Sequence, residues 1–218
     1  LLPVSTSVQQ IDYKKDLNPI CSKQYGPLLV FKELWRKLEL DKVLKGAFDK
    51  TSTVYDLERA IFNLVLNRLV APTSKRRMGI FQDSVYGIDK LDCHQYYRAM
   101  DYLIDNKDDI EKGIYKKMLK QHKGKVSMAL FDTTSLVYYG EDPKDESELL
   151  AHGFSKARRG DLKQIVVGVL MSQDGIPLGH ETYSGNSSDV NCFDDIINKA
   201  VDKYGIERVI FVGDRGMV

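Results

Sequence analysis

The stretch Val126-Ser127-Met128-Ala129-Leu130-Phe131-Asp132 decides the fold class, because here the chain changes from helical to strand periodicity. Its short apolar run predicts a β-strand over residues 126–137 with the carboxylate of Asp132 near the end. A carboxylate costs several kcal/mol to desolvate unless a partner or a metal ion compensates it. Taken alone, Asp132 is better explained as a strand-end residue that caps a turn.

A second aspartate, Asp214, follows the apolar run 208–213 and is flanked by Gly213 and Gly216 within two residues. If the two strands are neighbours, both acids fall on one edge of the sheet. Two such carboxylates repel each other unless a cation lies between them. Two-metal phosphoryl transfer uses this arrangement. The alternative for Asp214 is an ordinary Asp-Arg-Gly turn.

The residues between these two aspartates predict the rest of a sheet. Residues 162–171 form a β-branched run, Asp174-Gly175 favours a tight hairpin turn, and 176–183 form the return strand. A helix follows residues 187–189 and ends at Gly205, before the strand that carries Asp214. A strand that comes after a helix suggests a parallel crossover, so we expect a mixed sheet.

The first half of the chain has helical periodicity. An apolar face runs from Leu28 to Leu44, and a second helix opens at Asp56 and ends before Pro72. Residues 94–104 and 107–121 predict two more helices, although Gly113 weakens the second. The expected organisation is a helical region over 1–122, as a possible DNA-contacting module, and a core over 123–218, with the boundary near 122–125.

Composition is that of an ordinary globular chain. The 218 residues are 43% hydrophobic and 29% charged, with a net charge of +1. The three scattered cysteines favour a reducing cytoplasm over a disulfide framework. No apolar run is long enough for a transmembrane helix, so no membrane partner is expected. The chain starts at Leu1 without a signal pattern, and we expect both of its ends to be truncated.

Charge is unevenly distributed. Residues 1–125 hold 23 Lys and Arg against 16 Asp and Glu, a balance of +7, whereas residues 126–218 hold 9 against 15, a balance of −6. A basic module that grips nucleic acid beside an acidic module that holds metal would have this asymmetry. Two ordinary solvated surfaces would have it as well.

Two basic segments are candidate phosphate contacts. The loop 153–161 holds Lys156, Arg158 and Arg159 between glycines and can track a phosphate backbone; otherwise it is a flexible basic loop. The segment 67–77 ends a helix in a basic turn, which can contact DNA phosphates or simply complement the helix dipole. Residues 184–189 could bind an anion at a helix N-terminus, but a turn with helix capping is the preferred interpretation.

In their order along the chain, these residues resemble bacterial insertion-sequence DDE transposases of the insertion-sequence-four superfamily. The N-terminal region of that family resembles segments 25–29, 66–75 and 97–101. Residues 131–135 and 213–217 are similar to its two aspartate-bearing strands. Segments 153–164, 175–177 and 185–189 are similar to the blocks between them. The resemblance covers about Tyr25 to Met217, with Ala157 and Gly160 as departures in the basic loop.

The resemblance implies an α/β fold, a helical N-terminal region followed by an incomplete RNase H-like core. It implies that Asp132 and Asp214 are the first two catalytic, metal-holding acids, and that Mg²⁺ or Mn²⁺ is the cofactor. The partner is double-stranded DNA, both transposon ends and target, and the full-length protein is expected to be a homodimer in the bacterial cytoplasm. Lys156, Arg158, Arg159 and Arg215 are expected to contact DNA.

The family's third acid is a Glu within a Tyr…Arg…Glu…Lys signature, and it has no counterpart among these residues. We therefore expect a transposase truncated before that acid and inactive alone. The first alternative is an RNase H-like nuclease without strand transfer, and the second is a non-enzymatic DNA-binding remnant. A nucleotide-binding α/β fold is a weaker option, because no glycine-rich phosphate loop follows a strand.

Overall fold

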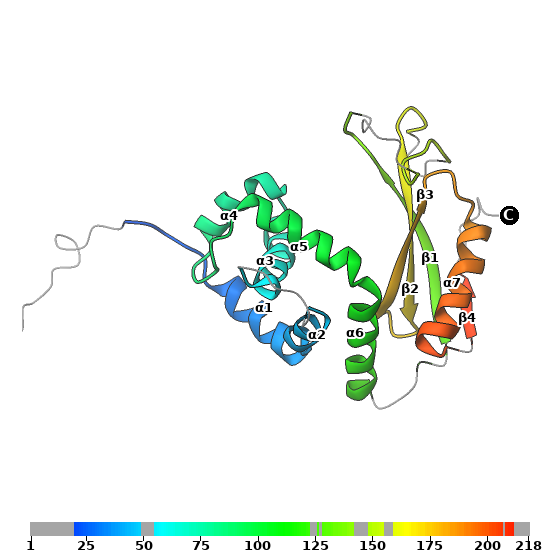
Figure 1. Ribbon diagram of the computed structural model, residues 1–218, viewed down its shortest axis with the longest axis horizontal. Coiled ribbons are helices and arrows are strands. Elements are labelled where there is room, and N and C mark those ends of the chain that lie inside the picture. The colour runs from blue at the N-terminus through cyan, green and yellow to red at the C-terminus, as the bar shows by residue number, and fades with distance from the viewer. Residues whose placement is uncertain are drawn as a thin grey trace, which may run out of the picture. The chain divides into compact units, whose positions relative to one another are not determined.

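The computed structural model describes residues 20–48, 55–122, 126, 128–141, 148–154, 159–206 and 208–211. In these ranges it is a mixed α/β structure with seven α-helices and one four-stranded sheet (Figure 1). The elements in chain order are α1 (Gly26–Lys37), α2 (Leu40–Ala47), α3 (Leu57–Val70), the 3₁₀-helix η1 (Lys75–Arg77), α4 (Met78–Ser84), α5 (Cys93–Asp105), α6 (Lys107–His122), β1 (Met128–Val137), β2 (Gln164–Ser172), β3 (Pro177–Ser184), α7 (Asp189–Tyr204) and β4 (Arg208–Phe211).

The chain divides into two compact units. The first comprises residues 1–35 and 52–101, and the second comprises 36–51 and 102–218. This division differs from the boundary predicted near residues 122–125, because α2 and α6 belong to the unit that contains the sheet. An aromatic contact joins α6 to this unit: the ring of Tyr115 on α6 meets that of Tyr204 on α7 edge-on, with centroids 5.0 Å apart. Helical periodicity alone does not show such a contact.

The first unit is helical, as the sequence predicted. Asp56 caps α3 through its side chain, which accepts a hydrogen bond from the amide of Arg59 at 3.2 Å, and the helix ends at Val70 before Pro72. Its core is apolar and comes from α1, α3, α4 and α5. The most deeply buried members are Ala60, Leu66, Met78, Tyr96 and Ala99.

The second unit is built on the sheet, with strand order β3-β2-β1-β4. Strand β2 pairs antiparallel with both β1 and β3, whereas β1 and β4 run parallel. The predicted mixed sheet with a parallel final strand is thus confirmed. Helix α7 makes the crossover between β3 and β4.

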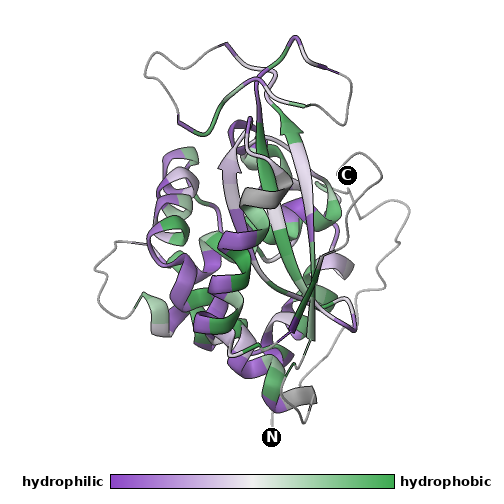
Figure 2. Ribbon diagram, turned by 90° about the vertical axis from the view of Figure 1, so that its right-hand side faces the viewer, coloured by the Kyte–Doolittle hydropathy of each residue, from purple (hydrophilic) through white to green (hydrophobic). Residues whose placement is uncertain are grey.

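One face of this sheet packs against α7 and α6. Phe131 and Leu170 from the strands meet Ile196 and Ala200 from α7, and all four are at least 97% buried. Figure 2 shows hydrophobic residues along the central strands and a mixture of hydrophilic and hydrophobic residues along the helices. Gly168 makes room for the Phe131 ring, because a Cβ there would lie 2.6 Å from Cε2 of that ring.

The predicted glycine turns are confirmed. Gly175 has φ +77° in the β2–β3 turn and donates to the carbonyl of Ser172 at 2.9 Å. Gly205 has φ +64° and ends α7, where its amide donates to the carbonyl of Val201 at 2.9 Å. Both positions need a left-handed conformation that glycine adopts without steric cost.

Three local features differ from the prediction. The apolar face from Leu28 to Leu44 forms two helices, because Glu39 takes a left-handed conformation with φ 53° between them. Helix α4 was not predicted. Gly113 does not interrupt α6; a Cβ there would lie 2.7 Å from Val43 on α2, so glycine allows these two helices to approach closely.

Among the described residues, no helix has both the length and the apolar character needed to cross a lipid bilayer.

Replacing Phe131 by alanine should lower the free energy of unfolding by about 3–5 kcal/mol, because the ring is fully buried. Urea denaturation followed by circular dichroism measures the change. Leu136→Ala is the matched control on the same strand; that side chain is 51% exposed, and its loss should cost less than about 1 kcal/mol. Equal losses in the two variants would contradict the described core.

Candidate functional site

Asp132 is the fifth residue of the ten-residue strand β1, so the prediction that it lies near the strand end is wrong. The strand continues because β2 pairs with it from Ala129 to Val137, and Asp132 lies opposite Val169. An aspartate is tolerated in mid-strand here because its side chain is exposed. The apolar run 128–131 marks the start of the strand and not its whole length.

The face of the sheet on which Asp132 lies follows from strand alternation. Phe131 and Thr133, its two neighbours, are buried, and the Phe131 ring lies 6.3 Å from that of Phe193 on α7. Because successive side chains of a strand point to opposite faces, Asp132 lies on the face away from α7. There the carboxylate meets solvent without a desolvation cost.

The carboxylate of Asp132 is only partly satisfied within the protein. Its Oδ1 accepts a hydrogen bond from the amide of Thr133 at 2.8 Å. Across the described ranges, no lysine, arginine or histidine forms an ion pair with it. One oxygen is therefore oriented by the backbone, and the other is open to a ligand from solution.

The pairing of β1 with β4 bears on the second aspartate. The parallel register runs from Met128 opposite Arg208 to Phe131 opposite Phe211. Asp132 thus follows the last described pair directly. Asp214 is three residues beyond Phe211 in the sequence and lies outside the described residues. The condition that the two strands are neighbours is met, whereas the proximity of the two acids stays a prediction.

Asp132 is a candidate oxygen donor for a metal ion. The described residues contain no group of three His, Cys, Asp or Glu side chains placed to hold a metal. Asp132 fits such a role as a single ligand, because it is exposed, free of cationic partners in those ranges and an oxygen donor of the kind that Mg²⁺ prefers. A group of three protein ligands that includes Asp132 would have to draw on residues outside those ranges.

Of the cations predicted to contact DNA, only Arg159 is described. Its guanidinium binds Asp161 with two hydrogen bonds of 2.8 Å and lies over the ring of Tyr139, 5.7 Å from the centroid. This pairing lowers the pKa of the Asp161 carboxyl to about 2. A role for Arg159 in DNA contact therefore requires that it exchange this partner. Lys156, Arg158 and Arg215 lie outside the described residues.

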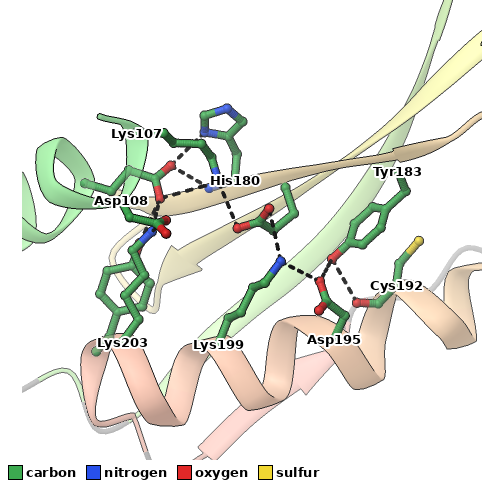
Figure 3. A network of polar contacts seen from close by, with 11 residues as sticks. Lys107, Asp108, His180, Tyr183, Cys192, Asp195, Lys199 and Lys203 are labelled. Atoms are coloured by element: carbon green, nitrogen blue, oxygen red, sulfur yellow. Dashed lines mark hydrogen bonds and ion pairs between the residues drawn. The ribbon is translucent and has the colours of Figure 1, made fainter. Parts of the chain in front are cut away.

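A polar network that connects α6, β3 and α7 was not predicted from the sequence (Figure 3). Its centre is Glu111 on α6, which is 11% exposed. One of its oxygens lies 2.6 Å from Nζ of Lys203, and the other lies 2.8 Å from Nδ1 of His180. Lys203 also binds Asp108 at 2.5 Å. This half of the network ties α6 to both β3 and α7.

The other half of the network runs along α7. Glu181 on β3 lies 2.8 Å from Nζ of Lys107 and 3.2 Å from Nζ of Lys199. Lys199 also binds Asp195, whose carboxylate meets the hydroxyl of Tyr183 at 3.0 Å. Carboxylates and cations therefore alternate throughout, which is the pattern of a charge-balanced structural clamp.

In this clamp, hydrogen bonds and nearby charges shift the pKa values in the direction opposite to the effect of burial. Burial raises the pKa of Glu111, but hydrogen bonds from His180 and Lys203, together with the charges of Lys107 and Lys203, outweigh it and bring the pKa to about 2. Burial likewise lowers the pKa of Lys203, and Asp108 and Glu111 reverse this to a net increase. Both charged forms are thus stabilised in the folded protein.

The sequence held only a partial signal for the clamp. Lys107–Glu111 and Asp195–Lys199 are i, i+4 pairs on their helices, a spacing that places both members on one helical face. Nothing in the spacing indicates that β3 inserts Glu181 and His180 between those faces. That junction depends on tertiary structure.

Comparison of the chain with protein-family models, with curated proteins and with solved structures finds no match.

The clamp predicts a pH dependence of stability. Because the pKa of Glu111 falls from its ordinary 4.5 to about 2 on folding, its contribution is complete above about pH 4.5 and is lost as the pH falls towards 2. Glu111→Gln should cost about 3 kcal/mol at pH 7 and much less near pH 2. Urea denaturation at a series of pH values measures both effects.

Asp202→Asn is the matched control, because this aspartate is exposed on α7. It should change the free energy of unfolding by less than about 0.5 kcal/mol at every pH. A Glu111→Gln variant with the same pH profile as the parent chain would show that the clamp contributes nothing.

Proposed function

We propose that this chain carries part of the catalytic core of a DDE-type DNA transposase, which cleaves transposon ends and joins the freed 3′-hydroxyl to target DNA. One observation carries the proposal: β4 lies beside β1 and runs parallel to it, and Asp132 follows their last described pair. Because β4 runs in the same direction as β1, Asp214, shortly after β4 in the sequence, is the natural second acid for a site beside Asp132.

The fold supports a finer assignment in the same proposal, an RNase H-like core. Such a core must bring two acids from sequence-distant strands together, and here 82 positions separate Asp132 from Asp214 in the chain. The crossover through α7 makes this possible, because a parallel pair of strands needs a long connection. The ordered resemblance of segments between Tyr25 and Met217 to insertion-sequence transposases is the second support.

In the proposed reaction, Asp132 acts as a ligand and not as a base. Its Oδ1 is oriented by the amide of Thr133, while the other oxygen is left for a divalent cation. Bound Mg²⁺ or Mn²⁺ would activate the attacking oxygen and stabilise the leaving oxygen of the phosphodiester. Exposure of Asp132 suits this role, since a duplex can reach an open sheet face. A third acid, the family's Glu, belongs to the proposal and is absent from these 218 residues.

A DNA-binding remnant without catalysis is the second candidate. It is favoured by the absence, among the described residues, of a group of three side chains that could hold a metal. The two candidates differ in whether Asp132 matters: a binding remnant needs cations for phosphates, and the transposase needs this carboxylate.

Metal binding by the 218-residue chain tests the proposal directly. Isothermal titration with Mn²⁺ should detect a site that Asp132→Asn and Asp214→Asn each weaken at least tenfold, because each variant removes one charged ligand. Asp174→Asn is the matched control, since this exposed turn aspartate is remote in sequence from both acids and its loss should leave the affinity unchanged. Equal affinity in all four proteins would contradict a metal site at Asp132.

Strand transfer requires the protein that includes the family's third acid. With that protein, Asp132→Asn should reduce the joining of a labelled 3′-end to a target plasmid by at least 1,000-fold, on the order of the loss of one essential group. Nicking without joining would favour the nuclease alternative. Salt-dependent DNA binding that ignores Mg²⁺, without cleavage or joining, would favour the binding remnant.

A further inference from the structure

The first unit contains a surface hollow of about 590 Å³ where α3 ends and η1 begins. It lies within one compact unit, well separated in sequence from both aspartates. Cations, hydroxyls and one aromatic ring line it. The lining residues are Arg68, Pro72, Thr73, Ser74, Lys75, Arg77 and Tyr97.

The charge of this hollow is uncompensated. Arg68, Lys75 and Arg77 line it, no carboxylate does, and segment 67–78 contains no Asp or Glu. In the part of the chain that the structure describes, none of these three cations forms an ion pair. Other cations of the same unit do: Arg59 pairs with Asp89, and Lys90 pairs with Asp83 at 2.5 Å. Three like charges gathered without a counter-charge favour an external anion.

The helix dipole does not explain the cluster. A cation in the last turn of a helix complements the negative C-terminal end of the dipole, an effect confined to that turn. Arg68 is in that turn of α3. Lys75 and Arg77, however, come after the helix has ended and belong to η1. Their position beside Arg68 therefore needs another reason.

The walls of the hollow are held in place by Asn67, a buried side chain. Its Nδ2 donates to the carbonyl of Ala71 at 2.8 Å and lies 3.1 Å from Oγ1 of Thr73, while its Oδ1 accepts from the amide of Thr73 at 3.3 Å. Met78, the residue after η1, is 1% exposed and lies in the core of the first unit. The turn that presents the cations is thus fixed by the fold before any ligand arrives, which lowers the entropic cost of binding.

The chemistry of the lining suits a phosphate ester. Guanidinium groups and an ammonium offer charge-assisted hydrogen bonds to phosphate oxygens. Ser74 precedes η1 without making a side-chain capping bond, so its hydroxyl can serve a ligand. The ring of Tyr97, 47% exposed, offers a flat apolar surface beside the charges. A carboxylate ligand would use the cations but not this combination.

We propose that this hollow is a phosphate-binding pocket that grips the sugar-phosphate backbone of DNA. A duplex fits better than a free nucleotide, because small ligands favour enclosed, mostly apolar pockets, whereas Arg68, Arg77 and Tyr97 are all exposed. Arg76 and Arg98, also exposed, adjoin three of the lining residues in sequence and extend the basic surface. The choice of DNA rests on the proposed function, but the pocket does not depend on Asp132 or on a metal.

The test compares two double variants of the 218-residue chain that lose the same charge. Lys75→Gln/Arg77→Gln removes two cations of the pocket, and Lys23→Gln/Lys32→Gln removes two exposed cations of the same unit that do not line it. Fluorescence anisotropy with a labelled 30-base-pair duplex of arbitrary sequence, without divalent metal, gives the affinity between 50 and 200 mM KCl. Thermal denaturation checks that each variant is folded.

The pocket variant should bind DNA at least tenfold more weakly at 100 mM salt, and its slope of log affinity against log salt should fall by about 2, one for each lost phosphate contact. The control should lose less than threefold. Arg77→Gln alone changes an exposed side chain and should lower the slope by about 1. It takes the place of the double variant in the test if the double variant does not fold. Similar losses in pocket variant and control would overturn the proposal.

Two further measurements distinguish a pocket for the DNA backbone from a pocket for small anions and from the metal site. Inorganic phosphate and adenosine monophosphate are titrated by calorimetry; binding of either that the pocket variant abolishes, with unchanged DNA affinity, would overturn the assignment to DNA. Titration of the parent chain with Mn²⁺ separates the two proposals. If Asp132→Asn loses Mn²⁺ binding and the pocket variant loses DNA binding, both proposals stand; if metal binding is absent throughout while the pocket variant loses DNA, only the transposase proposal fails.

Discussion

Alternation along β1 is the constraint on which the rest of this structure depends. Phe131 must enter the core, because its ring lies over Gly168 and beside Phe193 of α7. Asp132 is then forced to the opposite face, where its side chain is exposed to solvent. A register slip of one residue would exchange the two, burying a charge and exposing a phenyl ring. The same packing that stabilises the sheet thereby determines on which face of it Asp132 lies.

The acidic groups of the second unit have two different roles, and the presence or absence of a cationic partner separates them. Glu111, on the face that α6 and α7 cover, is buried and satisfied by Lys203 and His180, and its low pKa reflects that satisfaction. Asp132, on the other face, has one backbone hydrogen bond and no described cationic partner. Partnered carboxylates hold elements together, whereas an unpartnered one is available to a ligand. Geometry, and not residue type, separates structural from candidate functional acids here.

The cations divide in the same way. Arg159, a predicted DNA contact, is bound by Asp161 in two hydrogen bonds, so a carboxylate within the protein already balances its charge. In the sequence, the cations Arg68, Lys75 and Arg77 are ambiguous, because the helix dipole accounts for a basic turn as well as DNA contact does. The tertiary structure gathers these three around one hollow, and none of the residues that line it is an acid. Proximity of a counter-charge is invisible when cations are counted along a sequence.

The sequence by itself determined much of the local structure. Asp56 and Pro72 bound α3, Gly175 turns the β2–β3 hairpin and Gly205 ends α7, since each depends on one residue's own hydrogen bonding or backbone freedom. Tertiary structure alone decided what depends on partners: the break at Glu39, the approach of α2 to Gly113, the clamp around Glu111 and the mid-strand place of Asp132. Periodicity shows which face a residue takes, but only packing selects the element that meets that face.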